Sequence, residues 1–360
     1  MEQRQHPPDE SRAPSLPTEF IVADQIWVTT GGQNRIWITW ERQRRNRSVS
    51  AALGAQLFEI DIRSNRVWRY LLCAYQTLRI LATHKPGLVF VQNPSIVLSL
   101  LAMSWCRLSG TPIVMDAHNA GVYPFEGRRP WANRVAQFLF RTVSLTLVTN
   151  EALADYVKQS GGQAFVLPDP LPVFKYPLTV PEVCSLQRVL FICTWAADEP
   201  YVEVIKAACQ VSRNVTIYIT GNSRGRETAA GLPLPDNVIL TGYLADPEYE
   251  TLLQTCDLVI DLTTREDCLV CGAYEAVAAE RPLIVSDTRA LRGYFDRGTL
   301  YTNNQAPDLA EKIQLALLRA AGLIREMQAL KVVKQREWEF LRQGLEAQLQ
   351  GLAAATSEKA

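Results

Sequence analysis

The chain lacks the features that mark several large classes of protein. Its most apolar long stretch, Leu88–Cys106, is interrupted by Gln92, Asn93 and Pro94, so it reads better as a strand, a turn and a helix than as a membrane span. The first 18 residues are polar and rich in proline, and we expect no signal peptide. No repeat or low-complexity segment occurs between the two tails. These absences favour a cytoplasmic globular protein that is at most peripheral to the inner face of a membrane.

Histidine and paired cysteine are also scarce. Only three histidines occur, and the single C-x-x-C, formed by Cys268 and Cys271, has no second pair to complete a zinc site. A disulfide scaffold is not expected either, because five cysteines lie inside apolar runs, as buried thiols do. These are Cys73, Cys106, Cys193, Cys209 and Cys256.

Charge is balanced overall but not along the chain. The 360 residues carry 37 basic and 37 acidic side chains, and 48% of residues are hydrophobic, which is typical of a globular protein of two domains. Residues 35–172 hold 16 Lys/Arg against 8 Asp/Glu, a net charge of +8, whereas residues 173–360 hold 19 against 24, a net charge of −5. The first half is therefore expected to face an anionic membrane or phosphate.

Apolar strands alternate with helices, which predicts an α/β protein with a doubly wound parallel sheet in each of two domains. The strands expected in the first domain are Ile36–Trp40, Ala55–Ile60, Leu88–Gln92, Pro112–Asp116, Ser144–Thr149 and Ala164–Leu167. Those expected in the second are Val189–Cys193, Val215–Thr220, Val238–Thr241, Leu258–Leu262 and Leu283–Val285. Arg66–Thr83 is predicted to be an amphipathic helix whose apolar face consists of Trp68, Leu71, Leu72, Tyr75 and Leu78.

Prolines concentrated in Pro168–Pro181 indicate an interdomain linker. Phe20–Thr30 is read as a short extension before a Gly31-Gly32 turn. The expected division is a tail at 1–19, a first domain at 20–172, a linker at 173–187, a second domain at 188–322, a C-terminal helix at 323–352 and a tail at 353–360.

The stretch Asp257–Asp287 organises the second domain and reads as strand, loop, helix and strand. Its helix, Leu269–Ala279, ends before Pro282. The free backbone N–H groups of Leu269 to Gly272 would form a positive pole, and Glu275, one turn later, could accept hydrogen bonds from ribose hydroxyls. Amides for phosphate and an acid for ribose suit a nucleotide diphosphate.

This stretch resembles the donor-site signature of GT-B glycosyltransferases related to the group 1, mannosyltransferase-like enzymes. That family carries two acids spaced E-x7-E, a helix of small residues, Pro and S-D; here the spacing falls on Asp267 and Glu275, and Ser286-Asp287 completes the pattern. The resemblance implies two Rossmann-like domains with a cleft between them, and a C-terminal helix, here residues 323–352, that crosses back onto the first domain. It also implies a UDP- or GDP-sugar as substrate, with no cofactor and no metal, and catalytic roles for Asp267 and Glu275.

Ligands of open α/β sheets bind outside the carboxyl ends of the strands, so residues that follow strands of the second domain are donor-binding candidates. In the resembling enzymes, G-N/D-G and G-Y/F-L surround the base and ribose, and TGN and TGYL stand at these places here. Each alone would be an ordinary turn, but their order and spacing favour a donor site. The expected donor-binding residues are Thr194, Gly221, Asn222, Gly242, Tyr243, Leu244, Arg265, Val270, Cys271, Gly272 and Glu275.

One departure concerns the diphosphate. Retaining enzymes of the group have an Arg and a downstream Lys after the first strand of this domain, whereas this chain has the acidic TWAADEPYVEVIK; Arg224, Arg226 or Arg265 could take their place. The segment is similar to that of the mannosyltransferases acting on lipid-linked chitobiose. VQNP at Val91–Pro94 and DAHN at Asp116–Asn119 are similar too, where those enzymes have Q-N-P-P and D-W-H-N.

Candidate residues of the first domain also follow strands. His118, as a catalytic residue, and Asn119 are expected to point into the cleft, and Asn150 is read as a helix N-cap. Arginines 42, 44, 45 and 47 are placed in the loop after the first strand; a solvated loop is the ordinary reading, but four arginines there also suit an acceptor diphosphate or anionic headgroups. The expected acceptor-binding residues are Trp40, Glu41, Arg42, Arg44, Arg45, Asn93 and Asn119.

The resemblance implies a transferase that moves a mannose-like or glucose-like hexose from a nucleotide-sugar to a glycan or lipid-linked acceptor, with no nucleic-acid partner. Two alternatives stay open. A non-catalytic relative that binds nucleotide-sugar or carbohydrate is favoured by the missing Arg/Lys pair, while Glu275 and DAHN favour the enzyme. An epimerase of the same fold is the second alternative, and the arginine-rich loop argues against it.

Overall fold

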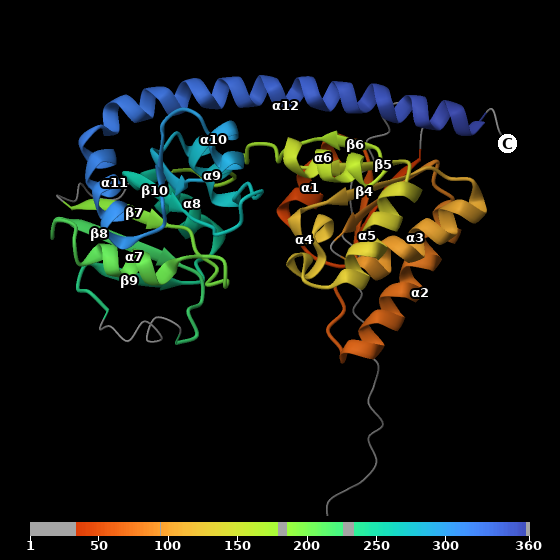
Figure 1. Ribbon diagram of the computed structural model, residues 1–360, viewed down its shortest axis with the longest axis horizontal. Helices are drawn as coiled ribbons and strands as arrows, with labels where there is room; N and C mark the ends of the chain where they lie inside the picture. Colours follow the sequence, from red (N-terminus) through yellow and green to blue (C-terminus); the bar gives the residue numbers. More distant parts are fainter. Residues whose placement is uncertain (1–33, 94, 179–185, 226–233, 358–360) are drawn as a thin grey trace, which may run out of the picture.

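Two α/β domains lie side by side beneath one long helix in the computed structural model (Figure 1). The structure describes residues 34–93, 95–178, 186–225 and 234–357. The predicted tail at 1–19, the Phe20–Thr30 extension, the Gly31-Gly32 turn, Pro94 and Arg226 lie outside these residues.

The first domain is a six-stranded parallel sheet with the strand order β2-β1-β3-β4-β5-β6. Its strands are β1 Arg35–Thr39, β2 Gln56–Glu59, β3 Leu88–Asn93, β4 Ile113–Ala117, β5 Leu145–Val148 and β6 Ala164–Val166. Its helices are α1 Arg44–Ala52, α2 Arg66–His84, α3 Ile96–Ser109, α4 Asn119–Val122, the 3-10 turn η1 Pro124–Gly127, α5 Pro130–Thr142 and α6 Glu151–Gln159.

The second domain repeats this plan with the strand order β12-β11-β10-β7-β8-β9. Its strands are β7 Gln187–Phe191, β8 Val215–Thr220, β9 Val238–Gly242, β10 Leu258–Asp261, β11 Leu283–Ser286 and β12 Thr299–Thr302. Its helices are α7 Tyr201–Ala208, α8 Asp246–Thr255, α9 Cys271–Ala279, α10 Arg289–Tyr294, α11 Ala306–Leu318 and α12 Ala320–Ser357. The predicted fold class is confirmed, although β12 and α10 were not foreseen.

Alternation along the strands divides each core into two layers. In β1, Ile36 and Ile38 pack on one face of the sheet, whereas Trp37 packs on the other. Trp37 is paired in register with Phe90 of β3, and their rings stack with centroids 5.1 Å apart. Burial on both faces explains why the strands read as continuous apolar runs.

Helix α12 spans both domains (Figure 1), as the resemblance implied, and continues to Ser357 rather than ending at 352. Leu345 and Leu349 are fully buried against the sheet of the first domain. Arg35 and Glu346 form an ion pair at 2.6 Å, and the Trp338 indole N–H donates to the Pro168 carbonyl at 3.0 Å. The last helix therefore belongs to the core of the first domain.

The face of helix α2 that packs on the core is not the predicted one. Cys73, Thr77 and Leu81 face the core, whereas the expected apolar face is exposed, with Trp68 58% and Tyr75 64% accessible. The helix has two apolar faces, and only the narrower one is used in packing.

We predict that Leu345→Ala destabilises the protein by about 2–5 kcal/mol, because it removes a fully buried side chain and leaves a cavity beneath α12. Leu318→Ala is the matched control: this side chain is 85% exposed, and the change should stay within about 0.5 kcal/mol. Urea unfolding followed by tryptophan fluorescence measures both. Equal stability of the two variants would show that α12 does not contribute to the core.

Candidate functional site

Loops at the carboxyl ends of both sheets meet between the two domains. Arg44 of α1 forms an ion pair with Glu275 of α9. The Asn150 side-chain amide donates to the Asp267 carbonyl at 3.0 Å, and a guanidinium nitrogen of Arg265 lies 3.5 Å from Glu126. These contacts place Arg44, a predicted acceptor-binding residue, opposite Glu275, and they bring Arg265 and Asp267 to the edge of the first domain.

Glu275 is held from both sides of the interdomain cleft. It is only 9% exposed; one carboxylate oxygen accepts from Arg44 and the other from the Tyr249 hydroxyl. Burial raises the pKa of Glu275, although Tyr249 and Arg44 favour its charged form. Arg44 also lies over the Tyr249 ring, 5.8 Å from its centroid. The predicted ribose acceptor is therefore positioned by a cation that the first domain supplies, a contact that the spacing pattern did not reveal.

One of the amides predicted to be free at the start of α9, that of Gly272, faces an internal carboxyl group. Asp261, at the end of β10, lies against Gly272, and the backbone N–H groups of Gly272 and Ala273 act to lower its pKa. A Cβ on Gly272 would lie 2.6 Å from Asp261 Oδ2, so glycine here makes room for an internal carboxylate. Burial raises the pKa of Asp261 well above its ordinary value, and nearby Glu199 and Glu275 raise it further. The helix terminus already has an acidic partner.

A second internal carboxylate occupies the loop after β7. Glu199 accepts from the Thr194 hydroxyl at 2.9 Å and from the backbone N–H groups of Thr194 and Ala196 at 3.0 and 2.8 Å. These amides lie where an Arg/Lys pair was expected to neutralise diphosphate. The acidic run in TWAADEPYVEVIK was the signal for this arrangement, and it is a structural feature of the loop.

The TGN and TGYL turns lie side by side, as their predicted shared role requires. Gly221 N donates to the Gly242 carbonyl at 2.9 Å, and both residues have positive φ. A Cβ on Gly221 would lie 2.3 Å from the Cys193 carbonyl oxygen, so this turn also packs on the Thr194 loop. Tyr243 is fully accessible beside them, whereas Asn222 caps its own turn by accepting from Arg224 N at 3.1 Å.

A polar network missed by sequence reasoning fixes the loop that carries Arg265 to Asp267. The Thr263 hydroxyl donates to Asp198 at 2.9 Å, and Thr263 N donates to the Ser286 hydroxyl at 2.9 Å. Asn304 completes the ring by donating to the Thr263 carbonyl at 3.1 Å. Arg265 lies 3.3 Å from Asp198. The S-D dipeptide thus matters through its serine, which orients this loop.

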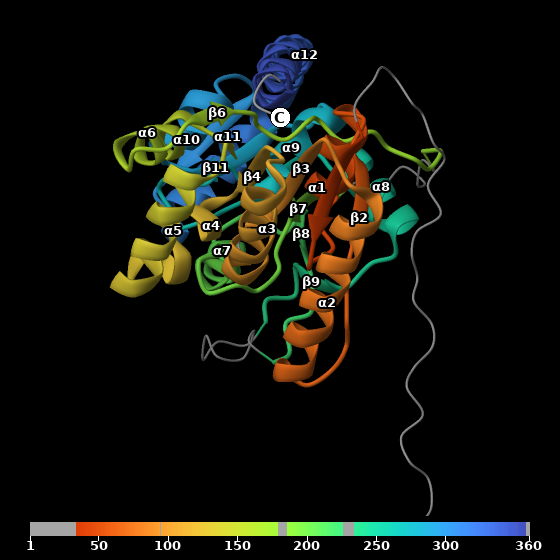
Figure 2. The ribbon, with the colours of Figure 1, turned by 90° about the vertical axis from the view of Figure 1, so that its right-hand side faces the viewer.

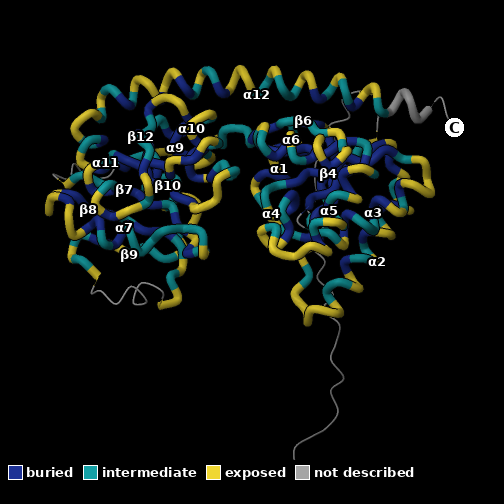
Figure 3. Tube along the Cα trace, in the orientation of Figure 1, coloured by how far each residue is buried: buried dark blue, intermediate teal, exposed yellow. Residues whose placement is uncertain are grey.

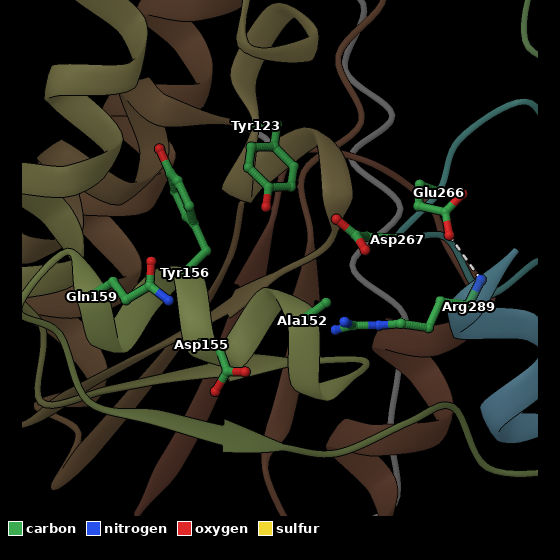
Figure 4. A pocket seen from close by; sticks show the side chains of 8 residues that line it. All are labelled: Tyr123, Ala152, Asp155, Tyr156, Gln159, Glu266, Asp267 and Arg289. Atoms are coloured by element: carbon green, nitrogen blue, oxygen red, sulfur yellow. Dashed lines mark hydrogen bonds between the residues drawn. The ribbon is translucent and has the colours of Figure 1, made fainter.

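Asp267 faces a cavity of about 510 Å³ between the domains. Figure 4 shows Tyr123 opposite Asp267, with residues of α6 along one side and Arg289 along the other. The cavity is lined by Tyr123, Ala152, Asp155, Tyr156, Gln159, Glu266, Asp267 and Arg289. Neither Glu275 nor His118 lines it, so the structure does not bring the three predicted catalytic residues into one cluster.

His118 lies at the end of β4, where DAHN predicted a ligand edge. Its Nε2 is 3.5 Å from Asp116 Oδ2, and its backbone caps α4, which begins at Asn119. Burial opposes ionisation of Asp116, but Arg45 and His118 outweigh this and hold the pKa of Asp116 well below its ordinary value. The imidazole thus faces a buried carboxylate, although the two groups form no standard hydrogen bond.

The prediction that arginines 42, 44, 45 and 47 all lie in the loop after the first strand is correct for Arg42 and wrong for the other three. Helix α1 begins at Arg44, and each of the four has a carboxylate partner: Asp61 for Arg42, Glu275 for Arg44, Asp116 and Asp169 for Arg45, and Glu59 for Arg47. The Arg45 side chain is only 2% exposed. Arg45 therefore joins β4 to the linker and does not reach a bilayer.

Two other predicted acceptor residues are buried. Trp40 donates its indole N–H to the Thr77 hydroxyl at 3.0 Å, beneath α2. Asn93 is fully buried and donates to the Gly121 carbonyl at 3.3 Å. Glu41 and Asn119 remain partly accessible. Asn150 caps α6 as predicted, accepting from Leu153 N at 3.1 Å.

The second domain matches a known family. Residues 187–319 match the family described as glycosyl transferases group 1. A search with the sequence found no match among curated proteins. Within the part of the chain that the structure describes, every helix is too short or too polar to cross a bilayer.

Solved structures of GT-B proteins share the whole two-domain fold. HepE of Anabaena, in complex with UDP and glucose, has a TM-score of 0.70 at 14% identity, covering 88% of this chain and 100% of HepE. Sucrose-phosphate synthase of Thermosynechococcus elongatus has a TM-score of 0.68 at 16% identity, covering 84% of each chain. A glycosyltransferase of Rickettsia africae has a TM-score of 0.63 at 10% identity, covering 89% of this chain and 99% of its own.

We predict that Asp261→Asn stabilises the protein increasingly as the pH rises. Because burial places the folded pKa above the unfolded one, wild-type stability is greatest below the unfolded pKa and is lost as the pH rises through the folded pKa. Each pH unit between the two values is worth about 1.4 kcal/mol. The gain in thermal midpoint should be larger at pH 8 than at pH 5.

Asp308→Asn is the matched control with the opposite sign. Burial opposes ionisation of Asp308, but hydrogen bonds from Thr302 and Asn303 outweigh it and lower its pKa. Its stabilisation is present above the unfolded pKa, so this variant should lose stability at both pH values. A loss for Asp261→Asn at pH 8 would mean that the carboxylate is required at the start of α9.

Proposed function

We propose that the protein is a glycosyltransferase. It moves a mannose-like or glucose-like hexose from a nucleotide-sugar bound by the second domain to a glycan or lipid-linked acceptor bound by the first. The observation that carries the proposal is the group 1 match over residues 187–319, together with Glu275 in the cleft at its family position. The nucleotide-sugar is a substrate, and we expect no metal or other cofactor.

A UDP-sugar is the donor to test first. HepE, which shares the fold, has been solved with UDP and with UDP-glucose. In this chain the Gly221–Gly242 pair and Tyr243 form the edge where a base would lie, and a GDP-sugar is the next choice. Glu275 would accept from ribose hydroxyls.

The ion pair between Arg44 and Glu275 indicates an exchange of partners when a donor binds. Ribose hydroxyls would replace Arg44 at the Glu275 carboxylate, and the freed guanidinium could then pair with the diphosphate. Arg265, which lies between Asp198 and Glu126, is the second available cation. Two arginines would thus stabilise the leaving diphosphate where backbone amides are already occupied.

On the acceptor side, His118 projects from β4 with its imidazole facing Asp116. We propose that it acts as the catalytic residue of the first domain, with Asn119, Glu41 and Arg42 beside the acceptor. Asp267 lines the interdomain cavity, and we propose it as the second acid of the reaction.

One observation favours the non-catalytic alternative. Glu199 and Asp261 occupy amides that would otherwise bind phosphate, and this acidic environment opposes a diphosphate. Such a relative would bind nucleotide-sugar or carbohydrate without turnover. A thermal-shift screen of UDP-, GDP-, ADP- and dTDP-sugars identifies the donor, since a ligand at 100 times its Kd stabilises by about 2.7 kcal/mol. Release or transfer of radiolabelled sugar from that donor then separates enzyme from binding protein.

We predict that Glu275→Gln weakens nucleotide-sugar affinity roughly tenfold or more without unfolding the protein, since a hydrogen bond to a charged group contributes ~1.5–3 kcal/mol. Isothermal titration with the donor from the screen measures this. Glu280→Gln is the matched control: it neutralises an acid at the other end of α9, where Glu280 pairs with Lys331 at 2.8 Å, and it should leave donor affinity unchanged. Wild-type affinity in Glu275→Gln would exclude Glu275 from the donor site.

We further predict that His118→Ala lowers kcat about a hundredfold or more, as for removal of a general acid or base, while donor affinity changes little. His84→Ala serves as the control, because His84 lies on α2, where its ring contacts the Ile80 carbonyl and the Phe58 ring of its own domain. Equal losses of donor affinity and turnover in His118→Ala would indicate a structural role.

A further inference from the structure

The outward side of α2 is an apolar helix face without a partner. Val67 is 68% exposed, and Leu71 is 55% exposed on the same stripe as Trp68, Tyr75 and Leu78. Positions 68, 71, 75 and 78 recur at helical spacing, so these side chains line one side of the helix. Figure 3 shows the exposed first turns of α2 projecting below the body of the first domain. We call Val67, Trp68, Leu71, Tyr75 and Leu78 the α2 face.

Positive charge surrounds the α2 face without any negative charge from the same segment. Residues 62–115 contain no Asp or Glu. Their basic residues are Arg63, Arg66, Arg69, Arg79, Lys85 and Arg107. Among the residues that the structure describes, none of these six forms an ion pair with a carboxylate, unlike the four arginines around α1. Their charge is therefore available to an external anion.

The neighbouring helices α3 and α5 also expose apolar side chains, and α5 carries arginines. Figure 2 looks onto α2, α3 and α5, which lie side by side. Exposed apolar side chains include Val97 and Leu108 on α3, and Trp131 and Phe138 on α5. Helix α5 also lacks an acidic residue and carries Arg134 and Arg141. The outer layer of the first domain thus combines tryptophan, tyrosine, leucine and arginine.

We propose that the α2 face docks the protein on the surface of an anionic lipid bilayer. An amphipathic helix with aromatic and aliphatic residues on one side and arginines along its edges is suited to lie in the headgroup region. Arginine side chains can extend toward headgroup phosphates while their methylene groups cover apolar surface. A second copy of the chain fits poorly, because a two-fold interface joins the same surface patch of both copies, and residues 62–115 bring no carboxylate to pair with their basic side chains.

The position of α2 determines where a bound bilayer would lie relative to the cleft. Helix α2 follows β2 and begins at the carboxyl edge of the first sheet, the edge on which α1 contacts the second domain. A bilayer on the first turns of α2 would therefore lie beside the opening of the cleft. An acceptor carried by a membrane lipid could reach the first domain without leaving the bilayer surface. The docking face itself does not depend on the proposed transfer.

Co-sedimentation of the full chain with vesicles tests the α2 face. Wild type should bind vesicles of phosphatidylcholine and phosphatidylglycerol but not vesicles of phosphatidylcholine alone. Binding should fall as ionic strength rises from ~0.05 M to ~1 M, because the Debye length shortens. Trp68→Gln/Leu71→Gln/Tyr75→Gln should weaken binding at least tenfold, and Arg63→Gln/Arg66→Gln by roughly fivefold for each arginine.

Two control variants test whether vesicle binding depends on where the substituted residues lie. Leu318→Gln/Phe340→Gln alters side chains that are 85% and 76% exposed, and Arg213→Gln/Arg336→Gln removes two exposed arginines of α12 and the second domain. Both should bind vesicles as wild type does. All variants alter exposed residues, and circular dichroism with a thermal shift by the nucleotide-sugar checks their fold and donor site.

The proposal is overturned if wild type fails to sediment with anionic vesicles at low salt, or if the triple α2 variant binds them as wild type does. Dimerisation of wild type in light scattering, lost in the triple variant and unaccompanied by vesicle binding, would assign the face to a second copy. Donor binding is measured separately on the same samples. Loss of the docking proposal would therefore be distinguishable from loss of the proposed function.

Discussion

The buried guanidinium of Arg45 fixes much of the geometry around the cleft. It donates to Asp116 at the end of β4, to Asp169 in the linker and to the Leu167 carbonyl at 2.9 Å. The first domain, the start of the linker and the carboxylate that faces His118 are thus joined by one side chain. Removing one member of such a buried set typically costs about 3–5 kcal/mol, because it leaves an uncompensated charge. Arg44, the preceding residue, is exposed and reaches across the cleft to Glu275. Arg44 and Arg45 therefore have different roles because their side chains point in different directions from the same helical turn.

That difference shows where sequence reasoning succeeds and where it stops. Runs of apolar residues between turn signals predicted the parallel sheets, because burial of both sheet faces requires such runs, whereas the return of the last helix to the first domain followed from the family resemblance. The same reasoning placed the arginines in a loop, since charge pattern does not reveal where a helix begins. For α2 it selected the wrong face, because Trp68 and Leu71 are as apolar as Cys73 and Leu81, and only the packing of α3 decides between them.

The predicted donor site of the second domain was also only partly predictable. The position of Glu275 and the adjacency of Gly221 and Gly242 were predictable from spacing. The roles of Glu199 and Asp261 were not, because a carboxylate in a sequence shows neither its direction nor its partners. Both turn toward backbone N–H groups of their own domain. A ligand phosphate would meet two carboxyl groups beside the amides of this edge, so its recognition would depend on arginine side chains that can exchange partners.

Helix α12 has a mechanical consequence. Its 38 residues make a rod of roughly 57 Å, attached to the first domain through Leu345 and Leu349 and to the second through Met327 and Leu330. The linker crosses between the domains near the same side of the molecule (Figure 1). The two domains are thus connected twice on the same side of the molecule. A hinge motion between the domains would therefore have its axis on this side, and the opposite side, from which α2 projects (Figure 1), would move the most.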